Sequence, residues 1–251
     1  MKTIQKITLS LLAVVAASSW NTASASNLIM DVEGADVATN SGVLTGTGQK
    51  IGTGTLVMSG ANGSSLTNLE IDAGLVQYAA TGNVGAQVTF AGGNMQTTAA
   101  ADIPALVMNA DATVTAGGAG ALAGLSGSNK LTVAGVGAVT PANLGASNTA
   151  VDISGVVHVG AAAGHILPNA AVNVLSGGLV EIQDAGAACA PGTNVVKSGA
   201  MLQVDPSLTV PAAGGSSSTD LFGTLQFDSG STLKLGNNAV WQRAITVGSA
   251  L

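Results

Sequence analysis

The chain has few of the residues that usually cover a soluble domain. Charged residues make up 8% of its 251 residues, whereas they make up roughly a quarter of an average globular domain. We therefore expect small residues and uncharged polar residues to cover the outer face. Aromatic residues are equally scarce, with six in the whole chain, which argues against an aromatic-filled core and against an aromatic platform for stacking ligands.

The sequence has a single cysteine, Cys189, which excludes an internal disulfide. An exported protein would otherwise use such cross-links in its oxidising surroundings. We interpret Cys189 as a small apolar filler in an alanine-rich stretch. An intermolecular link or a reactive thiol is the alternative.

Long apolar runs are also absent, apart from one near the start of the chain. Residues Ile7 to Ala17 form an apolar run of about eleven residues, which is too short to span a bilayer. Two lysines precede this run, and the small residues Ala23-Ser24-Ala25 follow it. This order predicts an export signal over residues 1–25, with Ser26 as the first mature residue.

Basic residues are too few for a nucleic-acid-binding surface. The predicted signal holds two of the seven basic residues and none of the thirteen acidic ones, so the mature chain has a net charge of −8. Phosphate backbones and anionic lipids are bound by clusters of lysine and arginine. We therefore expect no nucleic-acid partner and no attraction to anionic lipid.

The most informative stretch runs from Val172 to Ile182. Apolar and polar residues alternate on both sides of a Ser-Gly-Gly turn, as they do in half-buried strands. The glycines allow the backbone to take positive φ at the corner. Similar pairs of short strands recur along most of the chain, and they predict that interior positions such as Val174, Ile182, Val204 and Leu235 are fully buried.

The corner glycines recur at nearly equal intervals along the chain. The clearest series is Gly135, Gly155, Gly177 and Gly199. Their period of about 20 residues, without helical periodicity, is typical of a β-solenoid, in which each strand pairs with its equivalent in the next coil. We predict an all-β fold, a single-stranded right-handed parallel β-helix of roughly ten coils.

The pattern divides the chain into segments. Residues 26–50 are irregular and polar, and we expect an N-terminal cap there. Residues 51–236 should form the coils, and residues 237–251 either a C-terminal cap or the start of a further coil. Within the coils, Ala99 to Gly127 is almost all alanine and glycine and predicts a loose coil with a protruding loop, while Pro141 to Thr149 predicts a second break.

Three stretches resemble the autotransporter-associated β-strand repeat: Gly52 to Asn62, Leu69 to Val76, and Leu167 to Gly178. The resemblance implies a right-handed β-helix passenger at the surface of a Gram-negative bacterium, often adhesive. It also implies a translocator barrel, for which the stretch after Leu235 is too short. A barrel would therefore be a partner only as part of a longer product.

No constellation in the sequence predicts catalysis. His158 lies between two valines and should face outward, while His165 lies in a connection. The acidic candidates are Glu70, Asp72, Asp152 and Glu181, all outward by alternation. Asp152 and Glu181 are separated by about one and a third coils, so we do not expect them to share a face. We predict no catalytic, cofactor-binding or metal site.

These patterns together predict an exported structural or adhesin-like β-helix. It would display loops for host, cell–cell or self contacts, with no catalysis, cofactor or small-molecule substrate. Two alternatives stay open. One is a polysaccharide lyase or hydrolase, which needs paired carboxylates on one face. The other is an ice-binding solenoid, suggested by Thr45-Gly46-Thr47, Thr53-Gly54-Thr55 and Thr113-Val114-Thr115, which form no regular ladder in the sequence.

Overall fold

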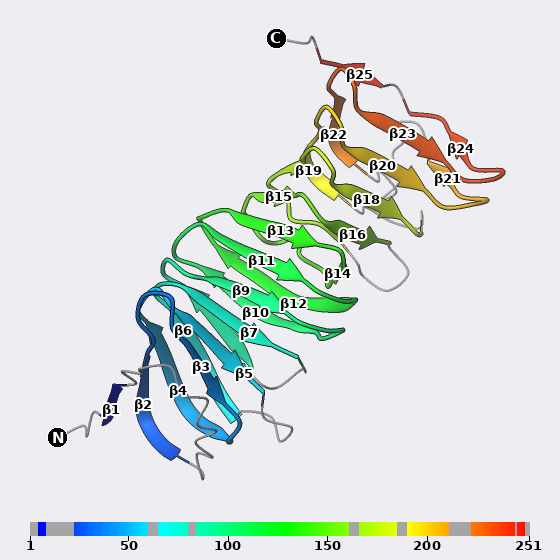
Figure 1. Cartoon of the computed structure of the whole chain (residues 1–251). Helices are drawn as coiled ribbons and strands as arrows, with labels where there is room; N and C mark the ends of the chain where they lie inside the picture. The colour runs from blue at the N-terminus through cyan, green and yellow to red at the C-terminus, as the bar shows by residue number, and fades with distance from the viewer. Residues whose placement is uncertain are drawn as a thin grey trace.

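The computed structural model describes residues 5–8, 23–59, 65–79, 84–160, 166–184, 190–210, 222–243 and 245–248. Every regular element within these ranges is a β-strand, and every strand pairing is parallel. The strands stack into a rod of about nine turns, with the two ends of the chain at opposite ends (Figure 1). The prediction of an all-β parallel β-helix is therefore confirmed.

Two long sheets face each other along the rod, because successive strands alternate between them. The first sheet has the order β1 (Gln5–Thr8), β2 (Ala23–Asp31), β4 (Leu44–Ile51), β6 (Ser65–Ile71), β8 (Gln87–Phe90), β10 (Ile103–Met108), β12 (Gly120–Gly127), β14 (Ala138–Pro141), β16 (Val156–Val159), β18 (Leu179–Ile182), β20 (Met201–Val204) and β23 (Thr232–Leu235). The second sheet has the order β25 (Thr246–Val247), β22 (Phe222–Phe227), β19 (Ala190–Val196), β17 (Ala171–Val174), β15 (Val151–Ile153), β13 (Leu131–Gly135), β11 (Ala112–Ala116), β9 (Asn94–Thr97), β7 (Leu75–Tyr78), β5 (Thr55–Met58) and β3 (Val37–Asn40). Near the C-terminal end, β21 (Thr209–Val210) and β24 (Val240–Trp241) form a separate pair.

The strand register gives the length of each coil. Up to β20 the coils are similar in length, from a short one that pairs Gln87 with Ala105 to a long one that pairs Val156 with Leu179. The connection to β23 is longer, since Met201 pairs with Thr232, about one and a half coil lengths further along the chain. The period of about 20 residues read from the corner glycines agrees with the lengths of the coils up to β20, and not with the longer connection to β23.

Interior positions form continuous columns of apolar side chains through the rod. Val174, Ile182 and Val204 are buried, as the alternation predicted. Leu235 differs, because 42% of its surface is exposed. It lies on β23, the last strand of the first sheet, so no further described coil covers it. The prediction that Leu235 is buried was therefore wrong.

The corners need glycine for two physical reasons. At Gly135 the backbone has φ of +97°, and a Cβ would clash with the carbonyl oxygen of Ala116 in the preceding coil. A side chain would therefore meet both an unfavourable backbone conformation and a steric clash. Gly177 has φ of +81° but open space around it, so only its conformation favours glycine.

Two expectations about irregular segments were wrong. Residues 26–50 supply strands to both sheets, since β2 and β4 pair with each other and β3 pairs with β5. Ala99 to Gly127 also forms regular structure, namely β10, β11 and β12. Small residues fit this coil because, for example, a Cβ on Gly120 would clash with the carbonyl oxygen of Ala101. The alanines and glycines thus permit close packing of backbones.

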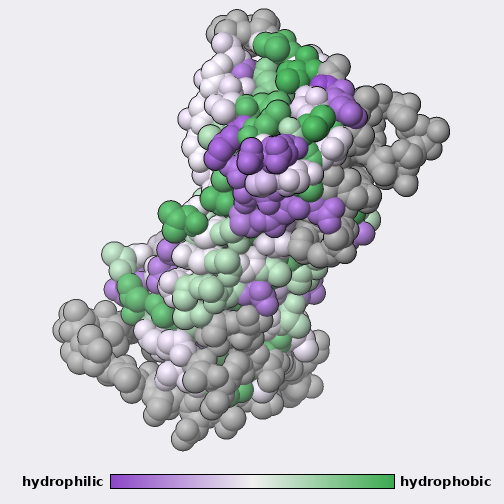
Figure 2. Space-filling view, turned by 90° about the vertical axis from the view of Figure 1, so that its right-hand side faces the viewer, coloured by the Kyte–Doolittle hydropathy of each residue, from purple (hydrophilic) through white to green (hydrophobic). Residues whose placement is uncertain are grey.

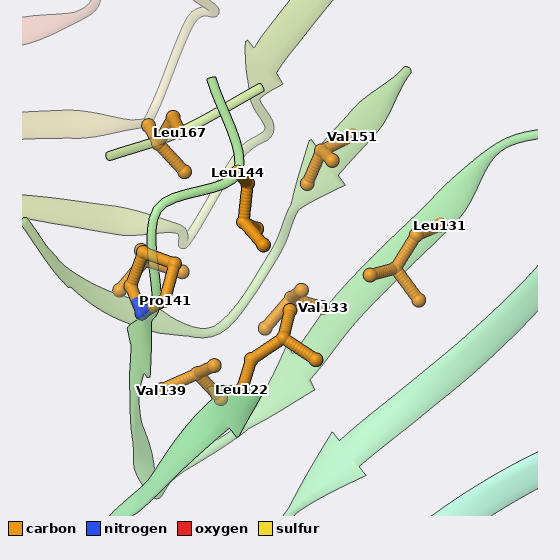
Figure 3. Close-up of a pocket in the computed structure, with 9 residues that line it drawn as sticks. Leu122, Leu131, Val133, Val139, Pro141, Leu144, Val151 and Leu167 are labelled. Carbon is orange, nitrogen blue, oxygen red and sulfur yellow. The ribbon is translucent and has the colours of Figure 1, made fainter. Parts of the chain in front are cut away.

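The break predicted at Pro141 to Thr149 coincides with an irregular connection. Within it, Asn143 forms an isolated bridge with Ile166. Leu144 and Leu167 are buried beside it. A cavity of about 10 Å³ lies between the sheets here, and Figure 3 shows its lining side chains around a common space. All of them are apolar: Leu122, Leu131, Val133, Val139, Pro141, Leu144, Val151, Val157 and Leu167. This space, about the size of one water, is a packing defect rather than a ligand site.

The two ends of the chain add strands to the stack. The segment after residue 236 contributes β24 and β25, and β25 extends the second sheet beside β22. At the other end, β1 and the start of β2 belong to the predicted export signal, while residues 1–4 and 9–22 lie outside the described residues. No helix in the described part of the chain is both long enough and apolar enough to cross a membrane.

Candidate functional site

Polar side chains form a ladder on the outer face of the first sheet, which we call the histidine ladder. It consists of His158 on β16, Glu181 on β18 and Gln203 on β20, which the strand register places directly beside one another. His158 Nε2 lies 2.9 Å from Glu181 Oε2. On the other side, Gln203 Nε2 donates a hydrogen bond to Glu181 Oε1. The ladder therefore joins three successive coils through their side chains.

Two further polar residues extend this cluster beyond the ends of the strands. Gln183 Nε2 lies 3.1 Å from His158 Nδ1, and Asp205 interacts with Glu181. Figure 2 shows hydrophilic side chains gathered over the C-terminal half of one side of the rod. The cluster is part of the outer surface: the side chain of His158 is 25% exposed and that of Glu181 is 18% exposed.

Glu181 is the electrostatic centre of the ladder. Burial raises the pKa of its carboxyl, and the hydrogen bond and the negative charge of Asp205 raise this pKa further. His158 and Gln183 act in the opposite direction. A carboxyl that keeps its proton to a higher pH beside an imidazole can exchange protons with a bound molecule.

A second polar ladder follows the outer face of the second sheet, and we call it the asparagine–threonine ladder. It runs over five successive coils through Asn94, Thr113, Thr132, Asp152 and Asn173. Asn94 Oδ1 accepts from the backbone N–H of Thr113 at 2.8 Å. Asn173 Nδ2 donates to Asp152 Oδ1, also at 2.8 Å. Only two threonines are adjacent in this column, so it does not form a continuous threonine surface.

Asp152 is more enclosed than its outward position suggested. It is 8% exposed, because Asn173 lies beside it and Lys130 Nζ is 2.8 Å from its Oδ2. The hydrogen bond and charge of Asp152 raise the pKa of the exposed Lys130. The carboxylate thus serves as a structural partner within its own sheet.

The two sheets separate the residues that a catalytic triad would need. Asp152 lies on β15 of the second sheet and His158 on β16 of the first, so the structure does not bring them together. Asp152 and Glu181 likewise lie on different sheets, as their spacing indicated. Glu70 faces outward between Gln49 and Thr89 in register. His165 and Cys189 lie outside the described residues.

Asp72, the remaining acidic candidate, accepts a hydrogen bond from Gln49 Nε2 at 2.7 Å on its Oδ2. Its Oδ1 is buried and has no hydrogen-bond partner among the described residues. No three His, Cys, Asp or Glu side chains of the described part lie close enough together to hold a metal ion. Asp72 therefore belongs to a polar contact between two coils.

The sequence analysis missed a buried cation, Lys50. Its position in the first sheet lies between Met30 and Ile71, and its side chain is fully buried. Nζ donates to the carbonyl oxygens of Gly52 and Ala73, the second at 2.9 Å. Burial lowers the pKa of Lys50, while the charges of Asp31 and Glu33 oppose this shift.

Two interactions, the burial of Lys50 and the pairing of His158 with Glu181, were not predicted from the sequence, for different reasons. Lys50 lies at an interior position of an alternating strand, but residues 26–50 were predicted to be an irregular cap, so no strand was expected there. The pairing of His158 with Glu181 requires one of the longest coils, in which Val156 pairs with Leu179. The spacing from Gly155 to Gly177 is one residue shorter than this coil, so counting by the corner glycines would have paired His158 with Val180 instead.

Comparison with protein-family models, with curated proteins and with solved structures gave no match for this chain. The fold and the chemistry of the outer ladders therefore carry the functional inference. Both ladders consist of amides, hydroxyls, carboxylates and one imidazole, and neither contains a Phe, Tyr or Trp side chain. Such groups can form hydrogen bonds with a polar partner along the rod.

Proposed function

We propose that this protein is an exported structural or adhesin-like β-solenoid that presents its outer faces and loops for host or cell–cell contact. The observation that carries the proposal is the combination of a continuous apolar interior with polar ladders on both outer faces. A rod of this kind holds many weak polar contacts at a fixed spacing of about 4.8 Å per coil. Repeated weak contacts give avidity without a single deep pocket.

Two sequence features support export and surface display. Residues 1–25 have the composition of an export signal, and the repeats resemble those of autotransporter passengers. A parallel solenoid can also fold coil by coil, because each coil contacts mainly its neighbours. Such a chain suits transport in an unfolded state, followed by folding at the cell surface.

Bead adhesion tests the contact function. Beads coated with the purified full-length chain should adhere to cultured cell layers or to bacteria more strongly than uncoated beads. Ladder variants Glu181→Ala and Gln203→Ala should reduce adhesion if the histidine ladder contributes, with Lys197→Ala beside the second sheet as the control. Adhesion equal to that of uncoated beads would contradict the proposal.

Processing tests the export part separately. When the chain is expressed in a Gram-negative host, N-terminal sequencing of the exported product should begin at Ser26. A product that retains Met1 and stays with the cytoplasmic fraction would remove the basis for surface display. The adhesion result does not depend on this outcome, so the two parts of the proposal can fail independently.

One observation favours polysaccharide cleavage as a second candidate function. Glu181, with its raised pKa, interacts with both His158 and the carboxyl of Asp205. This group could supply an acid and a base to a sugar chain lying along the first sheet. Incubation with acidic and neutral polysaccharides would reveal either a new carbon–carbon double bond or new reducing ends. Loss of this signal in Glu181→Gln would support the enzyme, whereas no signal in the wild type would support the binding role.

A further inference from the structure

One peptide bond at the surface of the rod is chemically weaker than its neighbours, namely the bond between Asp205 and Pro206. It is the only Asp–Pro bond in the sequence. A proline peptide is a tertiary amide, and its nitrogen accepts a proton more readily than other peptide nitrogens, so it leaves more easily. The aspartate carboxyl can also reach the carbonyl carbon of its own main chain by closing a small ring. The bond therefore combines a nucleophile with a good leaving group.

The structure holds this bond in a strained turn between β20 and β21. The backbone N–H of Leu208 donates to the carbonyl oxygen of Asp205 at 3.4 Å, and Ser207 has φ of +64°. Proline followed by a residue of positive φ is typical of a type II turn, in which glycine usually occupies the second of these positions. Serine adopts this backbone conformation unfavourably. Breaking the peptide bond would let the turn relax.

Neighbouring coils hold the turn from both sides. The N–H of Asp205 donates to a carbonyl oxygen of the preceding coil at 3.0 Å, and the N–H of Ser207 donates to one of the following coil at 2.9 Å. Gly236 lies directly against the bond, since a Cβ there would be 2.5 Å from the nitrogen of Pro206. Pro206 and Ser207 are exposed. The bond is thus held in place and open to water.

A proton donor lies beside the carboxyl of Asp205. Burial raises the pKa of Glu181, and a hydrogen bond between the side chains of Glu181 and Asp205 raises it further. The pair therefore retains a proton that two separate carboxylates would lose. His158 also faces Glu181 and opposes this shift, while Lys234 lies two coils away in register. The retained proton is available at the weak bond.

We propose that the Asp205–Pro206 bond is a self-cleavage site, at which the rod breaks its own chain without a protease. A carboxylate oxygen of Asp205 forms a bond to the main-chain carbonyl carbon of the same residue, giving a cyclic anhydride. The bond to the Pro206 nitrogen breaks, and this nitrogen keeps the electron pair and takes the proton that Glu181 shares with Asp205. One water then opens the anhydride, leaving two carboxyls on Asp205 and a free amine on Pro206.

The two pieces should stay together after cleavage. Strands β22 and β23, which follow the bond, pair with β19 and β20, which precede it. Only hydrogen bonds and core packing would then hold the C-terminal piece on the rod. Conditions that leave the uncut rod intact could therefore release this piece. This inference goes beyond the adhesive role and does not depend on it.

Mass spectrometry of the purified full-length chain, stored at mildly acidic pH, tests the proposal. Pieces that end at Asp205 and begin at Pro206 should accumulate at a rate that does not depend on protein concentration. The chain unfolded in urea should be cleaved roughly tenfold more slowly, because the turn no longer holds the reacting groups in place. Hydroxylamine added during the reaction should trap the anhydride and leave a hydroxamate on Asp205.

Three variants separate the roles of the side chains. Asp205→Ala should abolish cleavage. Glu181→Gln should slow it on the order of 100-fold and should remove the decline in rate with rising pH that loss of the Glu181 proton causes. Glu70→Gln is the matched control, because Glu70 faces outward on the same sheet but in coils far from the turn. It should keep the wild-type rate, and circular dichroism should show the same β-structure in all three variants.

Four outcomes would overturn the proposal. The first is a wild-type chain that stays intact. The second is a folded chain that is cleaved no faster than the unfolded one, which would reflect only the ordinary weakness of an Asp–Pro bond. The third is an unchanged rate in Glu181→Gln, and the fourth is an equal slowing in Glu70→Gln and Glu181→Gln.

Discussion

Lys50 and the histidine ladder differ in the groups that stabilise their charges. Lys50 lies at an interior position near the N-terminal end, and backbone carbonyl oxygens of Gly52 and Ala73 accept its hydrogen bonds. Glu181 lies on the outer face, and its partners are side chains of neighbouring coils. At Lys50 the interior accommodates a charge because the chain turns there and backbone oxygens are within reach. On the outer face of the first sheet, the charge of Glu181 is stabilised by polar side chains of the neighbouring coils.

The largest effect should come from a charge placed inside a straight strand, away from any corner. Val174→Asp would bury a carboxylate within the apolar column and should lower the free energy of unfolding by about 4 kcal/mol. Leu175→Asp is the matched control, because Leu175 is half-buried at the position directly after Val174, and this change should cost less than about 1 kcal/mol. Urea unfolding of both variants measures the difference. Equal losses would mean that the inside and outside positions are misassigned.

The next effect concerns the corners themselves. Gly135→Ala would force a side chain onto a backbone with φ of +97° and against the carbonyl of Ala116, and should cost about 1–3 kcal/mol. Gly124→Ala is the control, since its Cβ would lie at an ordinary 3.5 Å from the Cβ of Ala105. Thermal melts should show a clear loss only for Gly135→Ala. A similar loss at both positions would contradict the account of the corner.

The buried lysine should make stability depend on alkaline pH. Since burial lowers its folded-state pKa below the unfolded value of about 10.4, the unfolded chain binds more protons between these two values. The free energy of unfolding should therefore rise with pH across this window. Lys50→Met should remove the rise, which urea titrations at several pH values would detect. A variant with the wild-type slope would show that Lys50 is not the group responsible.

The smallest effects belong to the histidine ladder. Removing His158 should change the free energy of unfolding by less than about 0.5 kcal/mol at pH 7, because its contact is partly exposed. Glu181 should contribute a weak pH dependence of the other sign. Its folded pKa is raised above the unfolded value of about 4.3, so stability should fall as pH rises between these values. Glu181→Gln should flatten this decline; an unchanged decline would point to another acid.

The sequence predicted the fold because two signals agreed. Alternating residues marked the strands, and corner glycines gave an approximate period, which the register of β13 with β15 matches. The signals failed where composition concealed the alternation. The alanine-rich coil from Ala99 to Gly127 looked loose, although its small residues allow neighbouring backbones to pack closely.

The candidate site was harder to predict than the fold. Alternation placed His158 and Glu181 correctly on the outside, but it could not say which outer residues are neighbours. Neighbours depend on the length of each coil, which differs between the coil that pairs Gln87 with Ala105 and the one that pairs Val156 with Leu179. Lys50 was missed because a charged residue at an interior position is stabilised by backbone oxygens of the corner, which leave no trace in the side-chain pattern.

The stacking of each coil directly upon the one before it can be measured by distances along one outer column. Nitroxide labels at Thr55 and Asn173, in a Cys189→Ser background, lie six coils apart in register, from Thr55 through Leu75 and Thr132 to Asn173. Their separation should be about 29 Å, at about 4.8 Å per coil. A label pair at Thr55 and Gln226 spans eight coils and should give about 38 Å. Two separations that do not increase in this ratio would contradict the solenoid on which the proposed function depends.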